Sequence, residues 1–242
     1  SITIGSDGLG LIAYHQATKH HLHAYARGPG QMDWATQPDP FRRYAGAPLI
    51  ALDHIPPTAE PRYEAAFVAG NVPAQPFTHR TVSQLFSDSL ALSARKQAGD
   101  ASWFLRINPS SGNLHPTEGY LICGPIAGLC DGPMVCHYAP AEHALERRAD
   151  VPLEIWGALT VDLPHPVLLI GFTSVHWREA WKYGERAYRY CQHDAGHAMA
   201  AMSLAAAGLG WHATLLDDLG TDSVAALLGV VHAQGAEPEA PD

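Results

Sequence analysis

Hydrophobic and polar positions follow a helical period over one long stretch near the end of the chain, residues 182–211. One side of this stretch is an apolar stripe, and alanine, serine and glycine fill most of the rest of its second half. A helix that is small or apolar on most sides is typical of a buried central element. Gly208 and Gly210 are expected to end it, because glycine adopts the left-handed C-terminal turn at little cost. We therefore predict that the fold is organised around this helix.

Shorter patterns before and after it predict a mixture of helices and strands. Residues 82–92 have an apolar helical face, with Thr81 as the expected N-cap and Gln84 completing a capping box. Apolar runs predict strands, and weaker or capped periodic runs predict helices. The expected strands are 103–107, 120–123, 134–138, 166–173 and 211–215, and the other expected helices are 14–23, 153–160 and 222–228. Because the two types do not alternate strictly, an α+β fold is favoured over a doubly wound one.

Proline divides the chain into two parts. Residues 1–77 form an N-terminal lead-in segment and a proline-rich arm, and residues 78–242 form the core. The arm carries Trp34, Phe41 and Tyr44, which indicates that it packs over the core rather than acting as a linker. The final residues, 232–242, are expected to be a polar, mobile tail. We expect a single domain overall, with one half of a longer tandem protein as the alternative.

Composition and charge exclude several classes of function. The chain of 242 residues is 47% hydrophobic and carries a net charge of −9, which argues against a nucleic-acid-binding surface. No apolar run is long enough to span a membrane, so no membrane association is expected. The four cysteines form no CxxC pair, and no signal peptide is expected. These features predict reduced cysteines in a cytoplasmic protein.

Two polar stretches are candidates for chemistry. The turn at 108–116 offers serine hydroxyls and backbone N–H groups around Gly112, and could hold the edge of a polar ring or an anion; an ordinary connection between strands is the alternative. Lys182 and Tyr183 lie at the expected polar head of the long helix, beside arginines. Burial and a neighbouring cation would move their pKa values toward neutrality, so that they could exchange protons. A solvated helix N-terminus is the alternative.

A histidine pair offers a third possibility. His193 and His197 have the i, i+4 spacing that lets two imidazoles reach one zinc ion, with Asp194 as a base. No clear third ligand follows in the sequence, so a zinc-dependent hydrolase is a minor alternative and no metal is expected.

Three stretches together resemble the nitroreductase family of flavoproteins, and within it the SagB-type dehydrogenases that include azoline oxidases. RINPSSGNLHPTEGYLI at 106–122 is similar to the family's R-x-x-PS-x-G segment. KYGERAYRYCQHDAGHAMAAMSLAAAGLGW at 182–211 is similar to its KYG-x-R-x-YR helix, and YHQATKH at 14–20 to its H-x-x-TK segment. The three in this order form a specific combination.

The resemblance implies a nitroreductase-like α+β fold, with a mixed central sheet flanked by helices and a long buried central helix. It further implies a homodimer with FMN at the interface and hydride transfer through flavin N5. It implies that Lys182 and Tyr183 assist proton removal from a small-molecule or modified-peptide substrate. The flavin ring and ribityl chain would contact Ser110, Ser111 and Gly112, with flanking Pro109 and Asn113 also in the cofactor site. The polar tail or phosphate would lie near Thr18, Lys19 or Arg106. Flavin supplies the redox chemistry itself, so the protein need only hold and tune it.

The sequence departs from the family pattern in two places. The chain ends soon after Val231, so the strand that usually follows the last helix and packs on the partner subunit is expected to be missing. Methionines at 199 and 202 stand where the family often has amides. A degenerate nitroreductase-fold domain that binds a partner without redox activity is therefore the rival to an FMN-dependent oxidoreductase.

Overall fold

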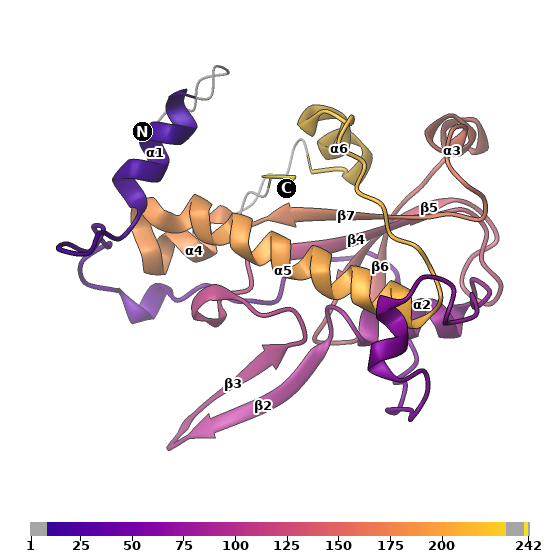
Figure 1. Cartoon of the computed structure of the whole chain (residues 1–242), viewed down its shortest axis with the longest axis horizontal. Coiled ribbons are helices and arrows are strands. Elements are labelled where there is room, and N and C mark those ends of the chain that lie inside the picture. The colour runs from indigo at the N-terminus through magenta and orange to yellow at the C-terminus, as the bar shows by residue number, and fades with distance from the viewer. Residues whose placement is uncertain (1–8, 231–239, 242) are drawn as a thin grey trace.

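The computed structural model describes residues 9–230 and 240–241, and its centre is an antiparallel sheet of six strands in the order β1-β6-β5-β4-β7-β8 (Figure 1). The strands are β1 Leu49–Ala51, β4 Thr117–Cys123, β5 Met134–Ala139, β6 Ala144–Asp150, β7 Leu168–Ser174 and β8 Ala240–Pro241. A separate hairpin, β2 Leu92–Ala98 and β3 Ala101–Arg106, extends away from the sheet. The expected α+β class is confirmed. The strand pairs described in the central sheet are all antiparallel, so the expectation of a mixed sheet is wrong.

Six α-helices and four short 3₁₀ turns complete the described part of the chain. The helices are α1 Leu9–Thr18, α2 His79–Ser87, α3 Leu153–Thr160, α4 His176–Tyr183, α5 Ala187–Gly208 and α6 Thr221–Leu228. The 3₁₀ turns are Trp34–Thr36, Tyr63–Phe67, Ser111–Asn113 and Gly184–Arg186. Across the described residues, no helix is both long enough and apolar enough to cross a membrane.

Each face of the sheet packs against a different set of helices. Successive residues of a strand point to opposite faces, so the residues of β4 contact both sets. Leu121 and Cys123 of β4 pack with Met202 of α5 and with α2. Tyr120 and Ile122 point to the other face, where Leu228 of α6 joins their cluster. The core therefore contains α5 on one side of β4, as its alanine-rich sequence predicts. All seven residues of β4 are buried.

The predicted helix 182–211 is divided in the structure. α4 ends at Tyr183, a 3₁₀ turn follows, and α5 begins at Ala187. The break lies at Gly184, whose φ of 53° and ψ of −123° are far from helical values. Because of this break, Lys182 and Tyr183 lie in the last turn of α4, and the prediction that they head the central helix is wrong.

Other boundaries also differ from expectation. α2 begins after Thr78, whose hydroxyl and that of Thr81 form the capping box, so Thr81 is the third helical residue and not the cap. Residues 211–215 form no strand. The last predicted helix begins one residue early, after Gly220, and ends before Gly229 as expected.

The proline-rich arm packs on the core, as its aromatic residues predicted. Trp34 contacts the Trp181 ring at 5.4 Å between centroids, and Phe41 contacts Phe104 at 6.1 Å. The Tyr44 hydroxyl lies 2.6 Å from that of Tyr120 on the sheet. Most of the predicted mobile tail, residues 231–239 and 242, lies outside the described residues. Two of its residues form β8, which pairs with β7 of the same chain.

Candidate functional site

The two most informative motifs of the sequence meet in space. Lys182 and Tyr183, hereafter the Lys–Tyr pair, lie against the 3₁₀ turn Ser111–Asn113. A Cβ atom placed on Gly112 would lie 2.7 Å from Tyr183 Oη and 3.0 Å from Lys182 Nζ. Gly112 also has a φ of 65°, a region that favours glycine. The glycine therefore permits both the shape of the turn and its close contact with the Lys–Tyr pair.

Asp194 of α5 fixes the turn from beneath. The backbone N–H of Ser111 donates to both oxygens of this carboxylate, at 3.0 and 3.1 Å, and the hydroxyls of Ser110 and Ser111 also interact with it. Ser110 Oγ in turn accepts from the His115 backbone N–H at 2.8 Å. The turn is thus held in place by side chains that the structure buries, while Gly112 itself is exposed.

Burial changes the protonation expected for Tyr183. The pKa of Tyr183 is raised to about 12, first by burial and then by the nearby Glu179, Tyr190 and Asp194, against a smaller lowering effect of Arg186. The sequence-based expectation that its pKa moves toward neutrality is therefore wrong. The phenol keeps its proton at neutral pH and acts as an O–H donor.

Glu179 is a site residue that the sequence reasoning missed. Its side chain is fully buried one helical turn before the Lys–Tyr pair, and its pKa is raised to about 9 by burial and then by Asp194. Glu179 precedes Lys182 by three residues and Tyr183 by four, a spacing that places side chains on one face of a helix. This spacing was a signal in the sequence that Glu179 belongs to the site. That signal was hidden because Glu179 was not assigned to the helix that carries the pair.

Beneath the site, buried charges connect α4 to the sheet. Arg178 Nη1 donates to Glu118 Oε1 at 2.6 Å and to the His115 carbonyl at 2.7 Å. His137 lies between two carboxylates, 3.0 Å from Glu118 and 2.7 Å from Glu146. Burial alone would raise the pKa of Glu118, but Arg178 and His137 together hold it at about 2. This network fixes the helix that presents the Lys–Tyr pair.

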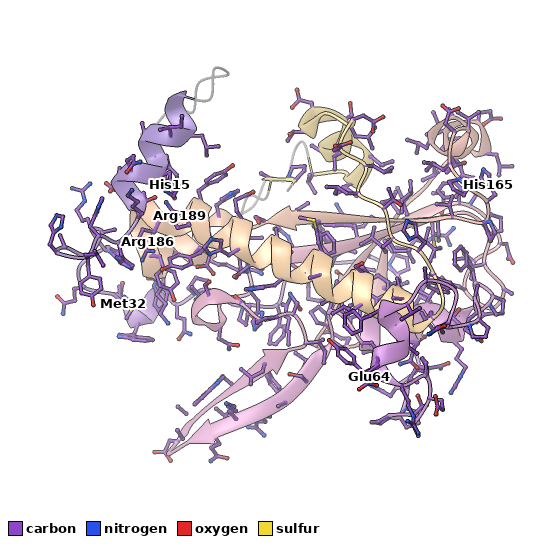
Figure 2. All side chains as sticks on the ribbon, in the orientation of Figure 1. His15, Met32, Glu64, His165, Arg186 and Arg189 are labelled. Atoms are coloured by element: carbon purple, nitrogen blue, oxygen red, sulfur yellow. The ribbon has the colours of Figure 1, made fainter. Side chains whose placement is uncertain are left out.

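Thr18 and Lys19 lie where α1 meets the start of α5. Thr18 Oγ1 is buried and accepts from Arg189 at 2.9 Å, and the Thr18 carbonyl accepts from Arg186, also at 2.9 Å. Figure 2 shows His15, Arg186 and Arg189 together at this end of the molecule. The structure thus gathers cationic side chains around Thr18 and Lys19, a chemistry that suits an anionic group.

Arg106, Pro109 and Asn113 are placed differently. Arg106 is buried and donates to the main-chain carbonyls of Pro40 and Thr117, and burial lowers its pKa to about 10. Its hydrogen bonds therefore tie the arm to β4 and do not extend to Thr18 or Lys19. Pro109 is exposed beside the turn, and Asn113 donates to the Phe104 carbonyl at 2.9 Å.

A cavity of about 230 Å³ borders the same turn on the side of the hairpin. Asn113 and Leu114 contribute to its wall, and the arm and β3 supply aromatic and proline side chains. The Lys–Tyr pair does not line this cavity. The pair is instead half-exposed at the surface, as are Ser111 and Tyr190. The candidate site is thus an open surface rather than an enclosed pocket.

The histidine pair does not form a metal centre in the described part of the chain. His193 and His197 are exposed, and Asp194 is used by the turn. No group of three or more His, Cys, Asp or Glu side chains among residues 9–230 and 240–241 is arranged to hold a metal ion. Within these described residues, the zinc-hydrolase alternative therefore has no third ligand.

Comparison with solved structures supports the same fold. A protein from Anabaena variabilis assigned to the nitroreductases matches 95% of this chain with a TM-score of 0.71 and 26% identity, but the match spans only 44% of that protein. The chain therefore has less than half the length of this relative.

Two further structures are similar in fold alone. One is the Escherichia coli microcin synthetase McbBCD complex with truncated pro-MccB17 bound, with a TM-score of 0.56 and 19% identity over 78% of this chain and 72% of that one. The other is a protein from Ralstonia eutropha assigned to the nitroreductases, with a TM-score of 0.55 and 17% identity over 80% of this chain and 85% of that one.

The comparison with protein families assigns the chain to a family. No curated protein matches the chain. The nitroreductase family, by contrast, matches residues 74–236, well over half of the chain, and this range contains the turn, the Lys–Tyr pair and α5. Members of this family are generally oxidoreductases that typically bind flavin. The chain belongs to the nitroreductase family.

Proposed function

We propose that the protein is an FMN-dependent oxidoreductase of the SagB-type dehydrogenase subgroup, with hydride transfer through flavin N5. The observation that carries this proposal is the contact between Gly112 and the Lys–Tyr pair. Gly112 and Lys182 are 70 positions apart in the sequence, yet Lys182 Nζ lies 3.5 Å from the Gly112 carbonyl oxygen. Two of the three stretches on which the resemblance rests are therefore in contact.

The residues of the site fit a flavin in their chemistry. The turn supplies hydroxyls and backbone N–H groups for the polar edge of the ring, and Ser110, Ser111 and Gly112 are the proposed contacts, with Pro109 and Asn113 beside them. Thr18 and Lys19 lie among cations suited to the phosphate. Arg106 is the weakest of the proposed ligands, because its guanidinium already binds two carbonyls. The bound flavin would accept the hydride, which is chemistry that no side chain here supplies.

The two members of the Lys–Tyr pair have different proposed roles. Tyr183 keeps its proton, so its hydroxyl orients and polarises the substrate as a donor. Lys182 is the group that takes a proton from the substrate. The half-exposed pair can be reached from solvent, which suits a modified peptide as well as a small molecule. The McbBCD complex holds a truncated precursor peptide, and we propose the same substrate class here.

Substitution of the pair tests these roles. In Lys182→Ala and Tyr183→Phe, oxidation of a synthetic thiazoline peptide should be about 10²- to 10⁴-fold slower, because a positioned acid or base is lost. Menadione reduction should be affected much less, since water can supply those protons. FMN content should stay close to that of the wild type.

Tyr190→Phe and Lys96→Ala are the controls. The Tyr190 ring contacts Tyr183 at 4.2 Å between centroids, and Lys96 is an exposed residue of the hairpin strand β2. If Lys182→Ala and Tyr183→Phe leave every turnover unchanged, the pair only ends a helix and the SagB-type assignment fails. If both substitutions remove the flavin, Lys182 and Tyr183 are flavin ligands rather than proton-transfer groups.

A further inference from the structure

Glu179 is the most anomalous polar group of the site. Its side chain has 0% exposure, and neither carboxyl oxygen has a hydrogen-bond partner among the described residues. Buried polar groups in native proteins are nearly always paired, so an orphaned one needs an explanation. Its neighbour Arg178 is also fully buried but binds Glu118 instead. The explanation therefore has to come from the other side of α4.

That side carries the Lys–Tyr pair. Residues three and four positions apart lie on one face of a helix, so Lys182 and Tyr183 both lie next to Glu179. Across the helix interface, the buried Asp194 of α5 also faces it. The titratable or charged groups around Glu179 are thus the Lys–Tyr pair from its own helix and Asp194 from the neighbouring one.

The protonation of Glu179 suits an exchange of protons. Burial, and then the negative charge of Asp194, raise the pKa of Glu179 to about 9, while Lys182 lowers it by less. Glu179 is therefore a neutral acid at pH 7. A neutral carboxyl can accept a proton on one oxygen while it releases another from the second.

Asp194 leads from Glu179 toward solvent. Its carboxylate binds the Ser111 N–H and lies 4.0 Å from Nδ1 of His197. The His197 side chain is 50% exposed. Imidazole is the side chain best suited to exchange protons with water near neutral pH, and one water molecule or a small rotation of the ring closes a gap of this size.

We propose that Glu179 relays protons between the Lys–Tyr pair and Asp194, from which they reach solvent at His197. This relay rests on the proposed function. When the pair takes a proton from substrate, Glu179 accepts it on its free oxygen and gives its own proton to Asp194. Asp194 passes that proton to the His197 imidazole and the imidazole passes a proton to water, so every group returns to its starting state. The reverse order would bring a proton from solvent to the Lys–Tyr pair when electrons alone reduce a bound flavin, as in photoreduction.

The protonated state of Glu179 can be tested without flavin and without an activity assay. Difference infrared spectra between the wild-type apoprotein and Glu179→Gln at pH 7 should show a protonated carboxyl C=O band in the wild type alone. Glu179→Gln keeps the size of the side chain but cannot exchange a proton. Absence of this band in the wild type would overturn the relay, whatever the outcome for FMN.

Proton movement is tested on the FMN-loaded protein by photoreduction in the presence of a pH indicator dye. In the wild type, proton uptake should keep pace with flavin reduction. Glu179→Gln should slow uptake by about tenfold or more, since a positioned proton-transfer group is lost. His197→Gln should also slow it, and added imidazole should restore the rate.

His193→Gln is the matched control, because this exposed histidine lies one turn away on α5 and forms no ion pair with Asp194 among the described residues. It should behave like the wild type. Unchanged uptake in both Glu179→Gln and His197→Gln would refute the relay while leaving the flavoprotein assignment intact. A protein that binds no FMN would instead refute the proposed function.

Discussion

At the scale of single residues, the site depends on a glycine and on two carboxyl groups whose environments differ. Gly112 makes room for the Lys–Tyr pair, Asp194 holds the turn, and Glu179 is buried without a partner. The turn and the pair could be predicted from their residue types and their family resemblance. The behaviour of Glu179 could not, because its raised pKa comes from tertiary burial and not from any property of a glutamate in a sequence.

A Gly112→Ala substitution tests the contact with the pair. The new methyl group would lie 2.7 Å from Tyr183 Oη, and an alanine with a φ of 65° is also strained. We expect a loss of about 2–4 kcal/mol in the free energy of unfolding, the sum of backbone strain and overpacking. Equilibrium unfolding in denaturant measures this change in the free energy of unfolding.

Gly99→Ala separates the two contributions. Gly99 has a similar φ of 59°, but its added Cβ meets nothing within 4 Å. The Gly99→Ala protein should lose only about 1 kcal/mol in its free energy of unfolding, from backbone strain alone. Equal losses in the two variants would mean that the turn does not contact the Lys–Tyr pair in solution.

At the scale of elements, the position of α4 is set by a helix break and by buried charges. Continuous apolar runs correctly predicted β4, β5 and β7. The strands β2 and β6 were missed because arginine, lysine and glutamate interrupt their apolar pattern. The break at Gly184 was missed because the residues on both sides are good helix formers, and only the backbone dihedral angles distinguish it. The Glu118–Arg178 and Glu118–His137 contacts join residues far apart in sequence, which no local pattern reveals.

Glu118→Gln tests the attachment of α4 to the sheet. Removing this carboxylate leaves Arg178 and His137 buried without their shared counter-charge, so we expect a loss of about 3–5 kcal/mol by urea unfolding at pH 7. Glu142→Gln is the control, since Glu142 pairs with Arg43 in a largely solvated ion pair that should contribute within about 1 kcal/mol. If Glu118→Gln is no worse than its control, the buried network does not hold α4.

The same carboxylate predicts a dependence on pH. The folded-state pKa of Glu118 is about 2, below its ordinary value of 4.5. The unfolded chain therefore binds the proton first, and the stabilisation is present above pH 4.5 and lost as the pH falls toward 2. Wild-type unfolding free energy should fall more steeply than that of Glu118→Gln across this window. Parallel curves for the two proteins would contradict the assigned charge state.

At the scale of the whole molecule, the outward face of α5 is where we propose that a second copy of the chain packs. Ala198, Met202 and Ala205 are buried in the core, whereas Ala200, Ser203 and Leu204 are exposed. The alanine-rich run therefore serves the core of this chain first. A charged residue at Ala205 would unfold the core, so a substitution there does not report on assembly.

Leu204→Arg is the better test of the proposed homodimer. Leu204 is 39% exposed in one chain, and a charge at a buried interface is strongly unfavourable. The substitution should halve the molecular mass measured by light scattering and lower FMN content, while the fold remains. Leu215→Arg, at a more exposed leucine outside α5, should change neither property. A wild-type monomer that retains FMN would contradict the proposal.

The central claim is that the turn and the Lys–Tyr pair form a flavin site, and the cofactor content of the purified protein tests it most directly. The protein is purified without added cofactor, its visible absorption spectrum is recorded, and the material released on denaturation is identified by mass. We predict a yellow protein that releases FMN at about one molecule per chain, or that binds FMN at this ratio once it is supplied. A colourless protein that cannot be loaded with FMN would contradict the account.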